Sequence, residues 1–248
     1  MIPVLFVHGF PFDHQMWRHQ VAALSRWRCI APDLIGAGRH PPPVSSENYS
    51  MAAFANDLIR LLDELKIEQV AACGLSMGGY VLFELLRRAR ERVCAAILCS
   101  TKALADTPEG KRGRDAMMRL TEDEGAPAIA EELIPKVLAR ATHLRRPDVV
   151  REVTEMILRQ NVAGIRGALS AMRDRPDSTP LLERIDVPVL VVAGDDDQIT
   201  PAAGMRSMAA AIPGAKFVLI PEAGHLTPLE QPEAVTEAIR DFLRGKVG

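Results

Sequence analysis

The chain has 248 residues, of which 48% are hydrophobic and 25% are charged, as in an ordinary globular domain. This composition excludes a disordered tail, a fibre and a disulfide-stabilised miniprotein. Thirty Lys and Arg residues stand against 32 Asp and Glu residues, so the formal charge at pH 7 is −2. Because proteins that bind nucleic acid carry a basic surface, we expect no nucleic-acid partner.

The cysteines and the first residues give expectations about the compartment. The four cysteines lie in apolar runs with no C-x-x-C pair and no zinc-ligand spacing, and we expect them to be reduced and buried: Cys29, Cys73, Cys94 and Cys99. The chain opens on a strand-like run rather than on the regions of a signal peptide. No apolar run reaches the roughly 20 residues of a membrane helix. We therefore expect a cytoplasmic protein without a membrane role.

Six short apolar runs predict buried parallel strands. They cover residues 4–7, 28–31, 69–73, 93–99, 189–193 and 217–220. Between them lie segments with helical spacing of apolar residues, such as residues 51–65. The alternation of strands and helices predicts an α/β fold with a doubly wound, mostly parallel sheet.

This alternation stops between residues 101 and 178. The stretch contains several helical segments punctuated by prolines and no strand-like run. We interpret it as an inserted helical cap, which leaves residues 1–100 and 179–248 as the core. Apolar residues of the cap could line a substrate pocket, but packing between the cap helices explains them equally well.

A glycine-rich turn joins the strand at 69–73 to a helix expected at 80–88. Its sequence, Gly74-Leu-Ser-Met-Gly-Gly79, places G-x-S-x-G between a strand and a helix, which is the context of a nucleophile elbow. Glycines at 74 and 78 avoid collisions with the neighbouring strand and helix. Ser76 is the predicted nucleophile, and the Met77 amide at the helix start is a predicted oxyanion donor. A glycine-rich turn without chemistry is the alternative for this motif alone.

The loop after the first strand, His8-Gly9-Phe10-Pro11, is expected beside this turn. The backbone amide of Phe10 is the predicted second oxyanion donor. We expect His8 to bond to nearby loop backbone and to be structural rather than catalytic.

A serine hydroxyl becomes a good nucleophile only when a base removes its proton and a carboxylate fixes the tautomer of that base. Residues 195–197 are three consecutive aspartates that follow the strand at 189–193. His225 follows the strand at 217–220 and is the predicted base. These residues complete a candidate triad with Ser76.

Together these motifs resemble the α/β-hydrolase-fold serine esterases, in the branch of small bacterial carboxylesterases and 3-oxoadipate enol-lactonase-like proteins. The matching pieces span nearly the whole chain and are His8 to Phe10, Asp33 to Arg39, Gly74 to Gly79, Gly194 to Pro201, and Gly224-His225 followed by Glu230 to Pro232. The resemblance implies, through the pattern G-x-x-D-x-x-x-P, that Asp197 is the catalytic acid. Asp195 and Asp196 are then expected to be turn residues.

The chain departs from the family in two places. Members usually carry an antiparallel strand pair before the strand that begins here at Ile2, and usually have Arg-Ser where this chain has Arg39-His40. We therefore expect the N-terminal antiparallel strands to be missing, which would expose a sheet edge and either lower the stability or favour a homo-oligomer. His40 is expected to face solvent.

The motifs predict an enzyme without a cofactor or a metal. No H-E-x-x-H pattern is present, and Gly36-Ala-Gly38 lacks the third glycine and the helix of a dinucleotide site. The predicted function is hydrolysis of carboxylic esters with short to medium acyl chains through Ser76, Asp197 and His225. A lactonase for an enol-lactone or acyl-homoserine lactone, or a perhydrolase, would use the same triad. A non-catalytic ligand-binding protein of this fold is the alternative from another class.

Overall fold

The computed structural model describes residues 2–43 and 49–246. At its centre lies a six-stranded sheet in the order β2-β1-β3-β4-β5-β6, in which all neighbouring strands are parallel. The strands are β1 (Val4–Val7), β2 (Cys29–Ile30), β3 (Val70–Leu75), β4 (Val93–Cys99), β5 (Val189–Gly194) and β6 (Lys216–Ile220). The predicted α/β fold with a parallel sheet is therefore confirmed.

Burial differs between the centre and the edges of the sheet. The central strands β1, β3, β4 and β5 are almost entirely buried, as expected for a parallel sheet covered on both faces. The prediction of buried strands is wrong for β2 and β6, which have one neighbour each and are partly exposed. All four cysteines are free, but only Cys73 and Cys99 are buried, because Cys29 lies on edge strand β2 and Cys94 near the start of β4.

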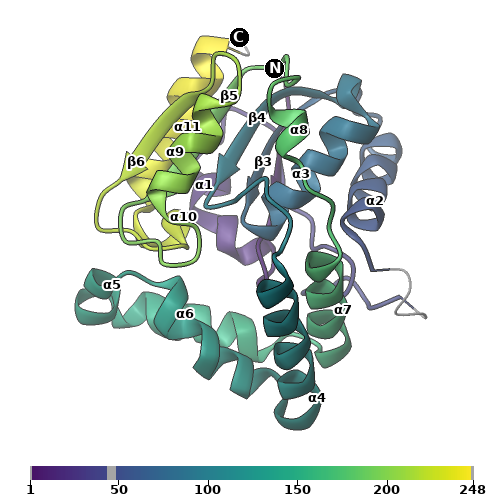
Figure 1. The fold of residues 1–248 in the computed structure, drawn as a ribbon. Helices are drawn as coiled ribbons and strands as arrows, with labels where there is room; N and C mark the ends of the chain where they lie inside the picture. The colour runs from purple at the N-terminus through teal and green to yellow at the C-terminus, as the bar shows by residue number, and fades with distance from the viewer. Residues whose placement is uncertain (1, 44–48, 247–248) are drawn as a thin grey trace.

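Helices lie on both sides of the sheet (Figure 1). The longer ones are α1 (Arg18–Ala23), α2 (Met51–Glu64), α3 (Met77–Arg88), α9 (Ala202–Ala210) and α11 (Pro232–Lys246); the short ones are η1 (His14–Trp17), η3 (Arg90–Arg92), α8 (Thr179–Leu182) and α10 (Thr227–Glu230). Helix α2 is capped by Ser50, whose hydroxyl accepts from the amide of Ala53, and it buries Phe54, Leu58 and Leu62. No helix in the described part of the chain combines the length and apolar character of a membrane span.

Between β4 and the short helix α8 the chain leaves the sheet and forms four helices. These helices are α4 (Pro108–Val137), α5 (Arg140–Arg145), α6 (Pro147–Leu158) and α7 (Val162–Arg173). We call them the cap helices, and Figure 1 shows them as a separate layer below the sheet. Helix α4 is interrupted at Gly125, whose φ of 75° lies in the left-handed region that glycine adopts readily.

A buried ion pair joins the two ends of the cap helices. Asp106 lies just before α4 and Arg175 just after α7, and their side chains are 2.9 Å apart and almost fully buried. The Arg175 guanidinium also lies 4.2 Å from the ring centre of Tyr80 on α3. Because a buried charge is costly without its partner, this pair holds both ends of the cap layer beside α3.

Helix α7 packs against the core through residues that lack side chains. A Cβ on Gly164 would overlap the carbonyl oxygen of Gly36, and a Cβ on Gly167 would overlap the ring of Tyr49. The cap layer can therefore approach the loop after β2 only because glycine occupies these positions.

We expect Gly164→Ala to destabilise the protein by about 1–3 kcal/mol, because the added methyl group must push α7 away from backbone. The matched control is Gly113→Ala in α4, where a Cβ meets nothing within 4 Å. Alanine there should stabilise the helix by about 0.5–1 kcal/mol. Thermal unfolding of both variants measures the two effects, and a Gly164→Ala protein as stable as wild type would contradict the packing argument.

Candidate active site

The turn between β3 and α3 holds its central residue in an unusual backbone conformation. Ser76 has φ 53° and ψ −110°, which a residue with a side chain rarely adopts. A Cβ on Gly78 would overlap the carbonyl oxygen of Val7, and one on Gly74 would lie 2.5 Å from the Gly78 carbonyl. Helix α3 begins at Met77, earlier than the predicted start at residue 80, because this close packing outweighs the low helix propensity of glycine.

The backbone of Ser76 is fixed from the side of β4. Its amide donates to the carbonyl oxygen of Cys99 over 2.9 Å. The hydroxyl of Thr101 donates to the carbonyl oxygen of Ser76 over 2.8 Å. The turn therefore presents the Ser76 side chain at the carboxyl edge of the sheet, where it is 9% exposed.

Asp197 and His225 form a buried pair at the same edge of the sheet. The Nδ1 atom of His225 lies 2.9 Å from Oδ2 and 3.1 Å from Oδ1 of Asp197. Asp197 also accepts from the amides of Ile199 and Thr200, each over 2.9 Å, and from the Thr200 hydroxyl over 2.6 Å. Burial opposes the charge of Asp197, but His225 and the Thr200 bonds outweigh it and lower the pKa of this carboxyl. Asp197 is therefore ionised at neutral pH.

The other two aspartates of the triplet point elsewhere. Asp195 and Asp196 are exposed, whereas Asp197 is buried. Asp195 accepts from the amide of Ala223 over 3.3 Å, and Asp196 accepts from the amide of Arg140 over 2.8 Å. Of the three carboxylates, Asp197 is the one that bonds to His225.

Ser76 and His225 lie after β3 and β6 of one parallel sheet, so both occupy its carboxyl edge. Among the hydrogen bonds of the described residues, none joins the Ser76 hydroxyl to His225. Hydrogen bonds of this kind are often long without substrate and shorten only in the substrate complex.

The two residues whose backbone amides are predicted to bind an oxyanion lie close together. Phe10 and Met77 line one narrow cavity of about 20 Å³. The neighbouring Gly9 faces the elbow, because a Cβ built there would lie 3.6 Å from the Cβ of Ser76. In the described part of the chain neither amide bonds to a protein acceptor, and Met77 is the first residue of α3, where amides lack an intrahelical partner. Both amides are free to donate.

His8 takes the structural role that the sequence predicts, whereas His40, expected to face solvent, is only partly exposed. The Nε2 atom of His8 accepts from the amide of Leu34 and its Nδ1 donates to the carbonyl oxygen of Gly9, both over 2.9 Å. Complete burial lowers the pKa of His8, so the ring is neutral. His40 is partly exposed and lies 3.2 Å from Asp57.

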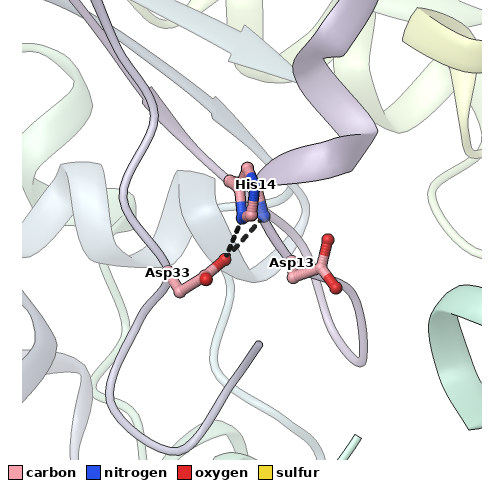
Figure 2. A group of neighbouring side chains, drawn as sticks. All are labelled: Asp13, His14 and Asp33. Atoms are coloured by element: carbon pink, nitrogen blue, oxygen red, sulfur yellow. Dashed lines mark hydrogen bonds and ion pairs between the residues drawn. The ribbon is translucent and has the colours of Figure 1, made fainter. Parts of the chain in front are cut away.

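Among the described residues, one group could offer three ligands to a metal ion, namely Asp13, His14 and Asp33. Figure 2 shows His14 bonded to Asp33. The backbone amide and the ring Nδ1 of His14 both bond to Oδ1 of Asp33, each over 2.8 Å. The oxygens of Asp13 already accept from Arg159 and Gln160 at the end of α6. A metal ion would have to displace these donors, and the cluster instead joins the core to the cap helices.

Three polar residues around the site have contacts that the sequence analysis did not assign. Thr101 bonds to the backbone of Ser76, Thr200 bonds to Asp197, and Glu230 bonds to the backbone on both sides of His225. Thr200 and Glu230 lie within motifs that identified the family resemblance. That resemblance marked the positions but did not show which atoms they contact.

Comparison with family models matches residues 2–232 to the family described as alpha/beta hydrolase fold. A thermophilic esterase from Thermogutta terrifontis is 43% identical, with 99% of this chain and 90% of that chain covered and a TM-score of 0.94. The enol-lactonase from Burkholderia xenovorans is 30% identical, with 98% and 92% covered and a TM-score of 0.90. A Bacillus subtilis protein, named provisionally as a 2-succinyl-6-hydroxy-2,4-cyclohexadiene-1-carboxylate synthase, is 29% identical, with 97% and 89% covered.

We expect His8 to make the protein less stable in mild acid. Its pKa in the folded state lies below the ordinary value of 6.5, so the unfolded chain binds a proton first as the pH falls. Stability should therefore fall below pH 6.5, by at most about 1.4 kcal/mol per pH unit. Urea unfolding at neutral and mildly acidic pH should show a smaller loss for His8→Asn than for wild type. The exposed His143→Asn is the control, and equal losses in His8→Asn and wild type would rule out this role.

Proposed function

The chain belongs to the alpha/beta hydrolase fold family, and from this premise we propose that it is a serine hydrolase that cleaves carboxylic esters with short to medium acyl chains. The observation that carries the proposal is the arrangement of the carboxyl edge, with Ser76 on a strained turn and a buried Asp197–His225 pair. The 43% identity to an esterase supports esters as the substrate class. A family fold alone does not determine the reaction.

In the proposed mechanism, the Ser76 oxygen attacks the ester carbonyl carbon while Nε2 of His225 takes the hydroxyl proton. Asp197 keeps the other ring proton on Nδ1, which leaves Nε2 free to act as the base. His225 then donates its proton to the leaving alcohol, and an acyl-enzyme remains. A water molecule, deprotonated by His225, attacks the acyl carbon, and the carboxylic acid leaves as Ser76 regains its proton.

The amides of Phe10 and Met77 are the proposed donors to the oxygen that becomes negative in both tetrahedral intermediates. The Met77 amide lies at the N-terminal end of α3, where the helix dipole also favours negative charge. The cavity that the two residues share has room for about one water molecule. We infer that residues 101–178 act as a cap over the site.

Lactone hydrolysis is the second candidate, and the 30% identity to an enol-lactonase favours it. It differs from ester hydrolysis only in that the leaving alcohol stays attached to the acyl group. A perhydrolase would use the same three residues, with peroxide in place of water. The Bacillus subtilis relative is named for a different reaction although its sequence is similar over nearly its full length. Direct assays therefore distinguish these reactions.

We expect rapid hydrolysis of p-nitrophenyl acetate and butyrate and slower hydrolysis of the dodecanoate, because a long acyl chain must find room between the proposed cap and the sheet edge. Ser76→Ala should abolish this turnover and also labelling by a fluorophosphonate probe. Simple lactones are assayed in parallel. Turnover of lactones alone would assign a lactonase, and an unlabelled Ser76 would favour a non-catalytic ligand-binding protein.

We expect Asp197→Asn to lower kcat on the order of 10⁴-fold, the effect of the same change in a serine-protease triad, because the amide favours the wrong tautomer of His225. Asp195→Asn is the matched control, since Asp195 is exposed and does not contact His225. Steady-state kinetics on a short-chain ester measures both. If Asp197→Asn retains activity within about tenfold of wild type, another residue is the acid.

A further inference from the structure

A buried carboxylate lies between the loop of His225 and the cap helices. Glu230 ends the short helix α10, and its side chain is almost fully buried. Four hydrogen bonds reach its two oxygens, two from the His225 loop and two from the cap. No residue in the described part of the chain forms an ion pair with it.

The bonds on one side of Glu230 hold the backbone around His225. Its Oε1 atom accepts from the amide of Gly224 over 2.9 Å and from the amide of Leu226 over 3.1 Å. These residues directly precede and follow His225. One oxygen atom thus holds the Ala223–Gly224 and His225–Leu226 peptide units, on either side of the residue that carries the imidazole ring.

The bonds on the other side hold the segment that joins α4 to α5 and the first turn of α5. The Oε2 atom accepts from the amide of Ala139 over 2.7 Å and from the hydroxyl of Thr142 over 2.6 Å. The carbonyl oxygen of Val137 in turn accepts from the amide of His225 over 3.1 Å. A Cβ on Gly224 would lie 2.5 Å from the Ala139 amide nitrogen, so the two segments are in direct contact.

Only a carboxylate satisfies this arrangement completely. All four partners are N–H or O–H donors, and each carboxylate oxygen can accept two of them. A glutamine has the same shape, but its NH₂ group would face two donors and leave them without an acceptor in a buried place. The arrangement therefore distinguishes Glu230 from a residue that merely fills space.

We infer that Glu230 is a positioning residue for His225, which it aligns by fixing residues 224–226 against the cap segment 137–142. The inference rests on the proposed role of His225 as the base. It assigns to one buried side chain both the orientation of the base and its connection to the cap helices. The position of the cap is thereby coupled to the alignment of His225 with Ser76.

The test compares ester hydrolysis and fluorophosphonate labelling in Glu230→Gln and wild type. A misaligned base slows the chemical step, so kcat and the labelling rate should fall together, on the order of 10²-fold, while KM changes little. The matched control is Glu237→Gln on α11, because the Glu237 side chain is exposed and bonds to none of the described residues. Wild-type kcat in Glu230→Gln would overturn the inference.

The same change is then made in a His225→Ala background. If Glu230 acts through His225, Glu230→Gln should lower the residual labelling rate no further there, whereas a general loss of structure would lower it in both backgrounds. If Glu230→Gln does not fold, Thr142→Val takes its place, because it removes only one of the four donors. Its smaller effect on kcat and on the labelling rate should likewise be absent in the His225→Ala background. An equal loss of labelling rate in both backgrounds overturns the inference about Glu230 but leaves the proposed function in place. A His225→Ala protein that labels at the wild-type rate overturns the proposed function and the inference together.

Discussion

The first turn of α3 lies directly against the end of β1, and this contact determines the backbone geometry of the turn that carries Ser76. It requires a glycine at 78 and leaves Ser76 in a left-handed backbone conformation. Such a conformation is costly and persists only where the surroundings hold it in place. Here the hydrogen bonds from Thr101 and to Cys99 hold it. Because the helix begins at Met77, the strained residue and a free backbone amide lie side by side.

The cap helices are held to the core by contacts of several kinds. The buried pair of Asp106 and Arg175 joins their ends, and glycine residues allow α7 to pack on the core. Arg159, just after α6, bonds to buried Asp13 in the loop after β1. Glu230 adds a link that reaches the loop of His225 itself. The cap is thus bonded to the loops that also shape the carboxyl edge of the sheet.

The comparisons show how one fold accommodates several activities. An esterase and an enol-lactonase both share nearly the full length of this chain. Esters and lactones differ little at the carbonyl group that a serine would attack, so the distinction lies in the space around that group. In this protein Ile165 of α7 lines the same small cavity as Phe10 and Met77, so the cap helices and the loop of Phe10 meet beside the Ser76 turn.

The sequence alone determined the parallel sheet, the glycine-rich turn and the residue types of the candidate site, because each has a local signature: an apolar run, close-packed glycines, or polar residues at a strand end. It overestimated the burial of β2 and β6 and placed the start of α3 too late, because neighbours distant in the chain control both. The resemblance to a family pointed to Asp197, but only the course of the loop after β5 brings that carboxylate, and not Asp195 or Asp196, to His225. The contacts of Glu230 were likewise decided by tertiary structure. They join residues about 90 positions apart in the chain, and a hydrogen bond over such a separation depends on how the elements pack rather than on any pattern within one element.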